Sequence, residues 1–141
     1  MDPAEAPKVI VDTNVVFSAI AHREGTPARV LVAVLSGQML VSPALLGEYR
    51  RVLGDPRGLS YLGIATEDLD DLLDFIARTA LIDPGGLGPI CPDPDDQHLW
   101  DLLAAGPRSV LLTGDRKLLA SHHFPGRILS PRDFVDRFLA T

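Results

Sequence analysis

Four acidic residues occupy positions along the chain from which they could bind a metal ion. Asp12 and Asp115 each follow a short apolar run, and Glu48 and Asp96 lie in segments with helical periodicity. Carboxylates bind hard cations such as Mg²⁺ and Mn²⁺, and these ions activate water and stabilise the charge that develops during phosphodiester cleavage. A donor set of oxygens without Cys or His favours such ions over zinc. The four acids therefore predict a metal-dependent hydrolytic site, if the fold brings them together.

Bringing these acids together has an electrostatic cost. Two carboxylates about 4 Å apart repel by about 4 kcal/mol at an effective dielectric of 20, so a cluster needs cations or raised pKa values. The chain has 13 Lys and Arg against 19 Asp and Glu, a net charge of −6, which argues against a simple module that binds nucleic acid by counterion release. Bound divalent ions would reverse the local charge that an anionic substrate meets.

Two predicted strands place acids at one edge of a sheet. The apolar runs 9–11 and 109–112 are typical of buried parallel strands, and Asp12 and Asp115 follow them. Ligands of open parallel sheets bind beyond the carboxyl ends of the strands. If these strands are neighbours, both acids reach the same edge. The alternative is that each acid only caps the helix behind it.

The remaining elements alternate between helices and short strands. A hydroxyl residue followed by proline predicts helix starts at Thr26, Ser42 and Ser130, where the side-chain oxygen can cap free amides, and Thr66 is expected to cap another helix. The alternation predicts an α/β fold, a three-layer α/β/α sandwich with a mainly parallel central sheet. The expected helices are 15–21, 28–35, 43–53, 67–78, 94–105 and short ones from 116 and 131; the other strands are 39–41, 80–82 and one near 128, with loops at 55–64 and 83–92.

Helical phase predicts that Asp96 and Asp101 lie on different faces of the helix that contains them. Asp96 shares a face with the apolar Leu99, whereas Asp101 points to the opposite side and is expected to be a solvated surface acid. Asp93 is a candidate N-cap with Pro94 behind it, so the alternative for Asp96 is a first-turn acid favoured by the helix dipole.

Glu48 is the weakest of the four candidates when taken alone. It lies three residues after Leu45 and four before Val52, at the margin of the apolar stripe of its helix. A glutamate at such a margin is more often a surface residue that extends into solvent. Its inclusion therefore depends on the other three acids.

Together, four segments resemble the motifs of the PIN-domain nucleases, in the order in which that family has them. The similarity runs from about Lys8 to the C-terminal helix and is greatest to the branch described as toxins of toxin–antitoxin pairs. The segments are Val-Ile-Val-Asp12-Thr13-Asn14, the helix from Ser42-Pro43 to Glu48, Asp93-Pro94-Asp95-Asp96, and Leu-Leu-Thr113-Gly114-Asp115.

The resemblance implies a fold, a metal site and an activity. The fold is PIN-like, and the activity is Mg²⁺- or Mn²⁺-dependent endonucleolytic hydrolysis of RNA by a water that attacks phosphorus directly. Asp93 and Asp95 leave the third acidic position open, and Asp96 is chosen on helical phase and spacing. The implied catalytic and metal-binding residues are Asp12, Glu48, Asp96 and Asp115, supported by Thr13, Asn14, Ser42, Asp93 and Thr113.

The resemblance also implies partners. It predicts a homodimer and a cognate antitoxin whose basic segment blocks the acidic pocket, as charge complementarity would allow. Arg116 and Lys117, directly after Asp115, are candidate contacts to RNA phosphates; the alternative is that they only solvate a short helix.

Two other functions remain as alternatives. One is a catalytically inactive PIN-like binding or scaffold module whose acids are helix caps. The other is a phosphatase of the haloacid dehalogenase kind with Asp12 as nucleophile. That family needs a second Asp where Asn14 stands and an acidic pair after the strand that ends at Thr113, whereas Asp95 precedes that strand.

Length and composition predict one domain over residues 1–141, with a flexible N-terminal segment over 1–7. The single Cys91 excludes an internal disulfide and a thiolate zinc site. The acidic, polar start does not resemble a secretory signal, and no apolar run approaches membrane-spanning length. We therefore expect a cytoplasmic protein with no membrane partner.

Overall fold

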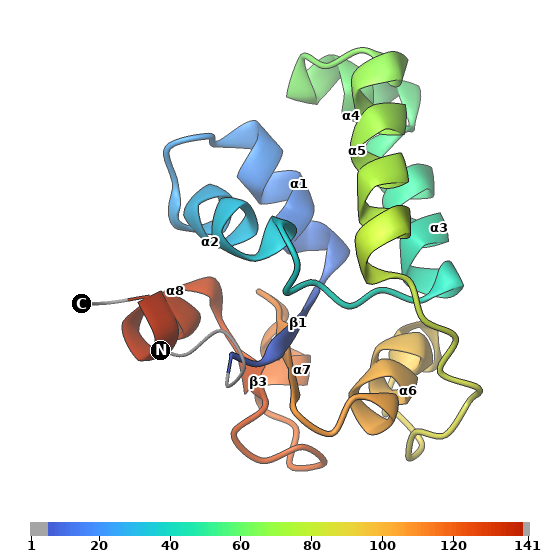
Figure 1. Ribbon diagram of the computed structural model, residues 1–141, viewed down its shortest axis with the longest axis vertical. Helices are drawn as coiled ribbons and strands as arrows, with labels where there is room; N and C mark the ends of the chain where they lie inside the picture. Colours follow the sequence, from blue (N-terminus) through green and yellow to red (C-terminus); the bar gives the residue numbers. More distant parts are fainter. Residues whose placement is uncertain (1–5, 140–141) are drawn as a thin grey trace.

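A computed structural model describes residues 6–139, which form an open parallel sheet with helices on both faces (Figure 1). The sheet has three strands in the order β1 (Lys8–Val11), β2 (Ser109–Leu112) and β3 (Ile128–Leu129). All pairs are parallel, and β1 and β2 are in register along their whole length. The predicted α/β sandwich is confirmed, and the two strands that precede Asp12 and Asp115 are direct neighbours.

Beyond β1, the described part of the chain continues the sheet as isolated bridges. Val9 pairs with Met39, and Val41 pairs with Leu81, both in parallel orientation. The amide of Val41 donates to the carbonyl of Ala80 (3.0 Å), which is still the last residue of a helix. The predicted strands 39–41 and 80–82 are therefore wrong in extent, because the chain reaches the sheet directly from a helix and leaves it after one bridge.

The helices lie close to their predicted positions, with one addition. Residues 55–64, predicted to be a loop, contain α4, because Asp55 accepts a hydrogen bond from the amide of Arg57 (2.9 Å) and Pro56 occupies the first helical position. The helical elements are α1 (Thr13–Ala21), α2 (Thr26–Leu35), α3 (Pro43–Leu53), α4 (Pro56–Leu62), α5 (Thr66–Ala80), the 3₁₀ turn η1 (Pro94–Asp96), α6 (Gln97–Ala105), α7 (Arg116–Leu119), α8 (Pro131–Phe134) and the π-helical turn η2 (Val135–Leu139).

Two of the four predicted hydroxyl caps are present. Ser42 and Ser130 accept hydrogen bonds from backbone amides three residues ahead. Thr26 and Thr66 are instead the first residues inside their helices, preceded by Gly25 and an alanine in the N-cap position. Each helix therefore begins one residue earlier than the cap prediction required.

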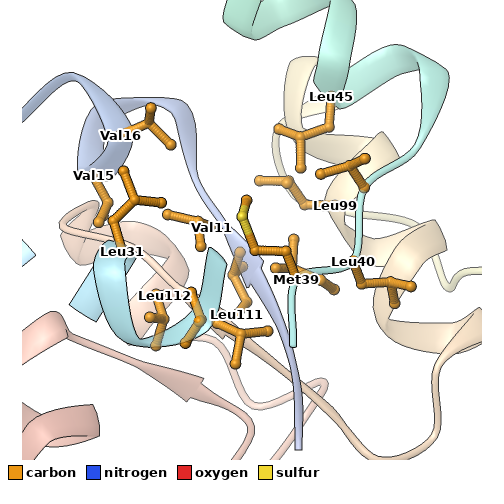
Figure 2. Close-up of a cluster of buried hydrophobic side chains, with 14 of the residues drawn as sticks. Val11, Val15, Val16, Leu31, Met39, Leu40, Leu45, Leu99, Leu111 and Leu112 are labelled. Carbon is orange, nitrogen blue, oxygen red and sulfur yellow. The ribbon is translucent and has the colours of Figure 1, made fainter. Parts of the chain in front are cut away.

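The core lies on both sides of β1 (Figure 2). Ile10 and Val11 are completely buried, as expected for a strand covered on two faces. Figure 2 shows Val15 of α1 on one side of this strand and Leu99 of α6 on the other. The strand that carries Asp12 at its end is therefore held by packing on both faces.

Some sequence predictions concern features outside these elements. Residues 1–5 of the predicted flexible segment 1–7 lie outside the described residues, and Ala6 and Pro7 lie within them. Within 6–139, no helix is long and apolar enough to cross a membrane. The assignment of the whole chain to one domain stays a prediction.

Candidate metal centre

A pocket at the carboxyl edge of β1 and β2 collects the four predicted acids. Asp12 and Asp115 come from the two strand ends, Glu48 from α3 and Asp96 from the turn before α6. The pocket is completed by Thr13, Asn14, Phe17, Ser18 and Val52. Four segments that are distant in sequence thus contribute acids to one pocket, while the catalytic role of those acids stays a prediction.

Asp12 is both a helix cap and a wall of this pocket. Its Oδ1 accepts from the amide of Thr13 (2.8 Å), which caps α1, and its Oδ2 accepts from the hydroxyl of Thr113 (2.7 Å). The side chain is held by both hydrogen bonds and is only 8% exposed. Burial raises the pKa of the Asp12 carboxyl, and the two hydrogen bonds oppose that rise. Capping and a place in the pocket, posed as alternatives from the sequence, occur together.

Thr113 connects the ends of β1 and β2. It is completely buried, and its hydroxyl donates to Asp12 while accepting from the amide of Asp115 (3.0 Å). Asp115 in turn accepts from the amide of Lys117 (2.9 Å) and so caps α7. The expected hydrogen-bonding support from Thr113 is therefore present in the structure.

Glu48 is attached to the pocket through Thr13. The Thr13 hydroxyl donates to Oε2 of Glu48 (2.6 Å), which connects α1 to α3. Its position at the margin of the apolar stripe was compatible with a freely solvated residue, but the Glu48 side chain is only 23% exposed. This contact holds the carboxylate beside Asp12.

Asp96 is the acid whose pKa changes most clearly. It is the last residue of η1 and the N-cap of α6, and its side chain makes no capping hydrogen bond. Burial raises its pKa to about 6, and the negative charges of Asp12, Asp93, Asp115 and Glu48 add to the rise. Asp96 therefore lies in the field of the other acids, and no hydrogen-bond donor among residues 6–139 offsets it.

Asp93, Asp95 and Asp96, the three candidates for the third acidic position of the site, lie in different places. Asp96 lines the pocket that holds the other three acids. Asp93 caps η1 by accepting from the amide of Asp95 (3.0 Å) and lines an adjacent depression. Asp95 lines a different depression, beside Glu48. The predicted N-cap role of Asp93 is confirmed.

The other predicted residues are less closely tied to the pocket. Asn14 lines it, but its exposed side chain makes no hydrogen bond to residues 6–139, and its supporting role at the site stays a prediction. Ser42 caps α3 and does not line the pocket. Lys117 lines the adjacent depression with Asp115, whereas Arg116 is an exposed residue that lines neither.

His98 was not selected from the sequence. Its Nε2 lies 3.7 Å from Oε2 of Glu48, and its side chain is 17% exposed. Within the described part of the chain, its Nδ1 is buried without a hydrogen-bond partner. The residue is two positions after Asp96, but only the packing of α6 against α3 brings it to Glu48.

Asp101 corrects a sequence prediction. It was expected to be solvated, yet it is partly buried and its Oδ1 accepts from the amide of Gly88 (2.9 Å) and from Gln97 (3.1 Å). The approach is close, because a Cβ on Gly88 would lie 2.7 Å from the carbonyl oxygen of Trp100. The loop over 83–92 therefore contacts Asp101 through Gly88 and keeps it from being fully solvated.

The donor chemistry fits a hard divalent ion, although the coordination shell is incomplete. Among residues 6–139, no three Asp, Glu, His or Cys side chains are close enough to surround one ion. The pocket nevertheless offers four carboxylates, and Mg²⁺ commonly uses only one or two together with its own water molecules. A cation would also offset the burial and the carboxylate repulsion that together raise the pKa of Asp96. The fit thus rests on donor type and charge.

Comparison with known proteins agrees with this arrangement. A family model described as "PIN domain" matches residues 8–117, which run from β1 into α7 and include all four acids. The chain is also similar to an uncharacterized protein of Methanocaldococcus jannaschii, MJ1680, with 26% identity over 142 aligned positions that cover 93% of this chain and 91% of that protein.

Proposed function

This chain belongs to the PIN-domain family, whose members are typically metal-dependent nucleases, and on that premise we propose that it is an endoribonuclease that uses Mg²⁺ or Mn²⁺. The observation that carries the proposal is the single pocket lined by Asp12, Glu48, Asp96 and Asp115 at the carboxyl edge of a parallel sheet. The phosphatase alternative is not supported, because the chain matches the PIN-domain family and has Asn14 where that phosphatase family needs a second Asp.

The four acids would hold the ion, which when bound supplies a water of lowered pKa and stabilises charge on the phosphate. The chain's own contribution is positioning. Thr113 and the amide of Thr13 fix both oxygens of Asp12, and the Thr13 hydroxyl fixes Glu48. Asp96 exchanges a proton at its carboxyl oxygens near pH 6, so it is ionised and available as a ligand above that pH.

The direct test is cleavage of a labelled mixed-sequence RNA with Mn²⁺, Mg²⁺ or EDTA. We expect metal-dependent cutting by the natural protein and loss of cutting in Asp12→Asn and Asp96→Asn. Asp74→Asn is the matched control, because Asp74 is an exposed acid on α5 outside the pocket. Normal cutting by Asp12→Asn would refute the assignment of the site.

The finer proposal is that this nuclease is the toxin of a toxin–antitoxin pair, a cytoplasmic homodimer inhibited by a basic antitoxin segment. The acidic pocket and the net charge of −6 support such a partner. Induced expression should then stop growth of a host, and Asp12→Asn should not. Growth arrest by both proteins would contradict a toxin that acts through this site.

An inactive scaffold is the second candidate, and one observation favours it. The acids share a pocket without converging on one point within residues 6–139. Calorimetric titration with Mn²⁺ separates the two candidates. Binding that disappears in Asp12→Asn supports the nuclease, and absence of binding by the natural protein supports the scaffold.

A further inference from the structure

An exposed aromatic pair lies beside the acidic pocket. The rings of Phe17 on α1 and Tyr61 on α4 stack, with centroids 5.6 Å apart and planes inclined by 20°. Tyr61 is 69% exposed, so the ring presents an open face to solvent. Phe17 also lines the pocket that contains the four acids. A stacking surface therefore begins at the edge of that pocket.

The packing of helices holds this pair in place. In Figure 1, α4 lies at the end of the α3–α5 pair, and α1 contacts both α3 and α4. A Cβ on Gly58 would lie only 2.8 Å from the carbonyl oxygen of Val52, which shows how closely α4 approaches the end of α3. Tyr61 is therefore carried by a helix that contacts α1 and α3 rather than by a loop tip.

Arginine side chains accompany the aromatic pair. Arg51 and Arg57 line the same depression as Phe17 and Tyr61, together with Val52, Asp55 and Gly58. Within residues 6–139, Arg57 makes no ion pair, and the only one of Arg51 is a long contact of 3.9 Å to Glu48. Guanidinium groups match phosphate oxygens well, so two arginines here can bind a polynucleotide backbone.

This depression is continuous with the acidic pocket. Phe17 and Val52 line both of them, and Arg51 lies on α3 three residues after Glu48. One acid, Asp55, belongs to the depression, and its Oδ1 is engaged by the amide of Arg57. Two aromatic rings, two arginine side chains and a neighbouring acidic pocket thus occur along one surface.

We propose that this Phe17–Tyr61 surface, with Arg51 and Arg57, binds single-stranded RNA beside the acidic pocket. A base stacks on the open face of Tyr61, and the flanking phosphates contact the two arginines. Stacking on an aromatic ring tolerates every base but requires a base that is not already stacked in a duplex. The inference rests on the proposed nuclease function and deepens it by placing a strand of substrate.

The test is fluorescence anisotropy with a short labelled mixed-sequence RNA. It is done with Mg²⁺ in an Asp12→Asn background, so that the RNA stays intact. Adding Tyr61→Ala should weaken binding about 5- to 160-fold, which corresponds to the loss of about 1–3 kcal/mol when one stacking ring is removed. Tyr61→Phe should bind like the background protein. Phe75→Ala is the matched control, an exposed aromatic on α5 that lies outside this surface.

Two further measurements make the result specific. Arg57→Ala should weaken binding and lower the salt dependence by about one counterion. The same RNA in a duplex should bind more weakly than the single strand. Equal binding by Tyr61→Ala and Phe75→Ala would overturn the inference, as would a change of oligomeric state in Tyr61→Ala without a change in RNA binding.

Failure of this inference is separable from failure of the proposed function. If the natural protein cuts RNA and Tyr61→Ala binds RNA normally, the inference is wrong and the nuclease assignment stands. If the natural protein cuts no RNA with any metal while Tyr61→Ala still weakens RNA binding, the surface stands and the nuclease assignment is wrong.

Discussion

The hydroxyl of Thr113 donates a 2.7 Å hydrogen bond to Oδ2 of Asp12 across 101 positions of sequence. Thr113 also accepts from the amide of Asp115, so one buried hydroxyl orients the first acid and holds the backbone of the last. Because β1 and β2 pair in parallel register, the residues after them meet at one edge. The placement of Asp12 relative to Asp115 therefore depends in part on this side chain.

Thr113→Val should keep the shape of this residue but remove both hydrogen bonds. A buried acceptor left unpaired costs about 1–3 kcal/mol, and loss of a group that orients a ligand typically costs 10- to 100-fold in metal affinity or activity. We expect both losses, measured by chemical denaturation and by RNA cleavage. Thr113→Ser should keep most of the stability and most of the cleavage activity. Full activity in Thr113→Val would show that Asp12 is positioned without Thr113.

Asp96 should make stability depend on pH when no metal is present. Its pKa is raised from 3.8 to about 6, so the folded state favours the protonated form. Its stabilising contribution is complete below pH 3.8 and is lost as the pH rises through about 6. Asp96→Asn should therefore be more stable than the natural protein at pH 8, by about 1 kcal/mol after allowance for solvent screening, and equal to it near pH 4.

Thermal denaturation in EDTA at several pH values measures this difference. The asparagine loses no hydrogen bond to residues 6–139, because the Asp96 carboxyl accepts none there. Asp74→Asn, at an exposed acid of α5, is the control and should show no such trend. A constant difference across the pH range would mean that burial and neighbouring charges do not raise the pKa of Asp96 in the folded state.

Addition of metal should make the natural protein more stable than Asp96→Asn, which reverses the order expected at pH 8 in EDTA. Mn²⁺ at about 100 times its dissociation constant should stabilise the natural protein by about 2.7 kcal/mol, since it binds only the folded state. Asp12→Asn should lose this gain, and EDTA should abolish it in the natural protein. Because a ligand carboxylate must be ionised, the gain should also shrink below pH 6. A metal shift of equal size in Asp12→Asn would place the ion elsewhere.

Two glycines test the packing of α4 on α3. A Cβ at Gly58 would lie 2.8 Å from a backbone oxygen, whereas a Cβ at Gly47 within α3 would have no neighbour within 4 Å. Gly58→Ala should therefore cost about 1–3 kcal/mol of unfolding free energy. Gly47→Ala should be neutral or stabilise by up to about 1 kcal/mol, because alanine favours the helix. Equal effects in urea denaturation would show that α4 adjusts freely.

Local sequence patterns were sufficient for much of the fold. The buried runs that end at Asp12 and Asp115, the caps at Ser42 and Ser130, and the alternation of strands with helices predicted a parallel α/β sandwich, which is confirmed. They failed at α4, although the capping residue Asp55 followed by proline was a usable signal. They also failed where single bridges replace strands, because one pair of hydrogen bonds leaves no periodicity in the sequence.

By itself, the sequence determined which residues end strands, cap helices and share a helical face, because these properties depend on backbone conformation and side-chain period over a few residues. It thereby predicted that Asp12 and Asp115 follow strand ends and reach one edge if those strands are neighbours, and the structure shows that they are. Only the tertiary structure decided that Glu48 is held by Thr13, that a loop covers Asp101, and that Tyr61 stacks beside the acidic pocket. Those contacts arise from the crossing of distant helices, which is set by how whole side-chain surfaces pack and not by any local pattern.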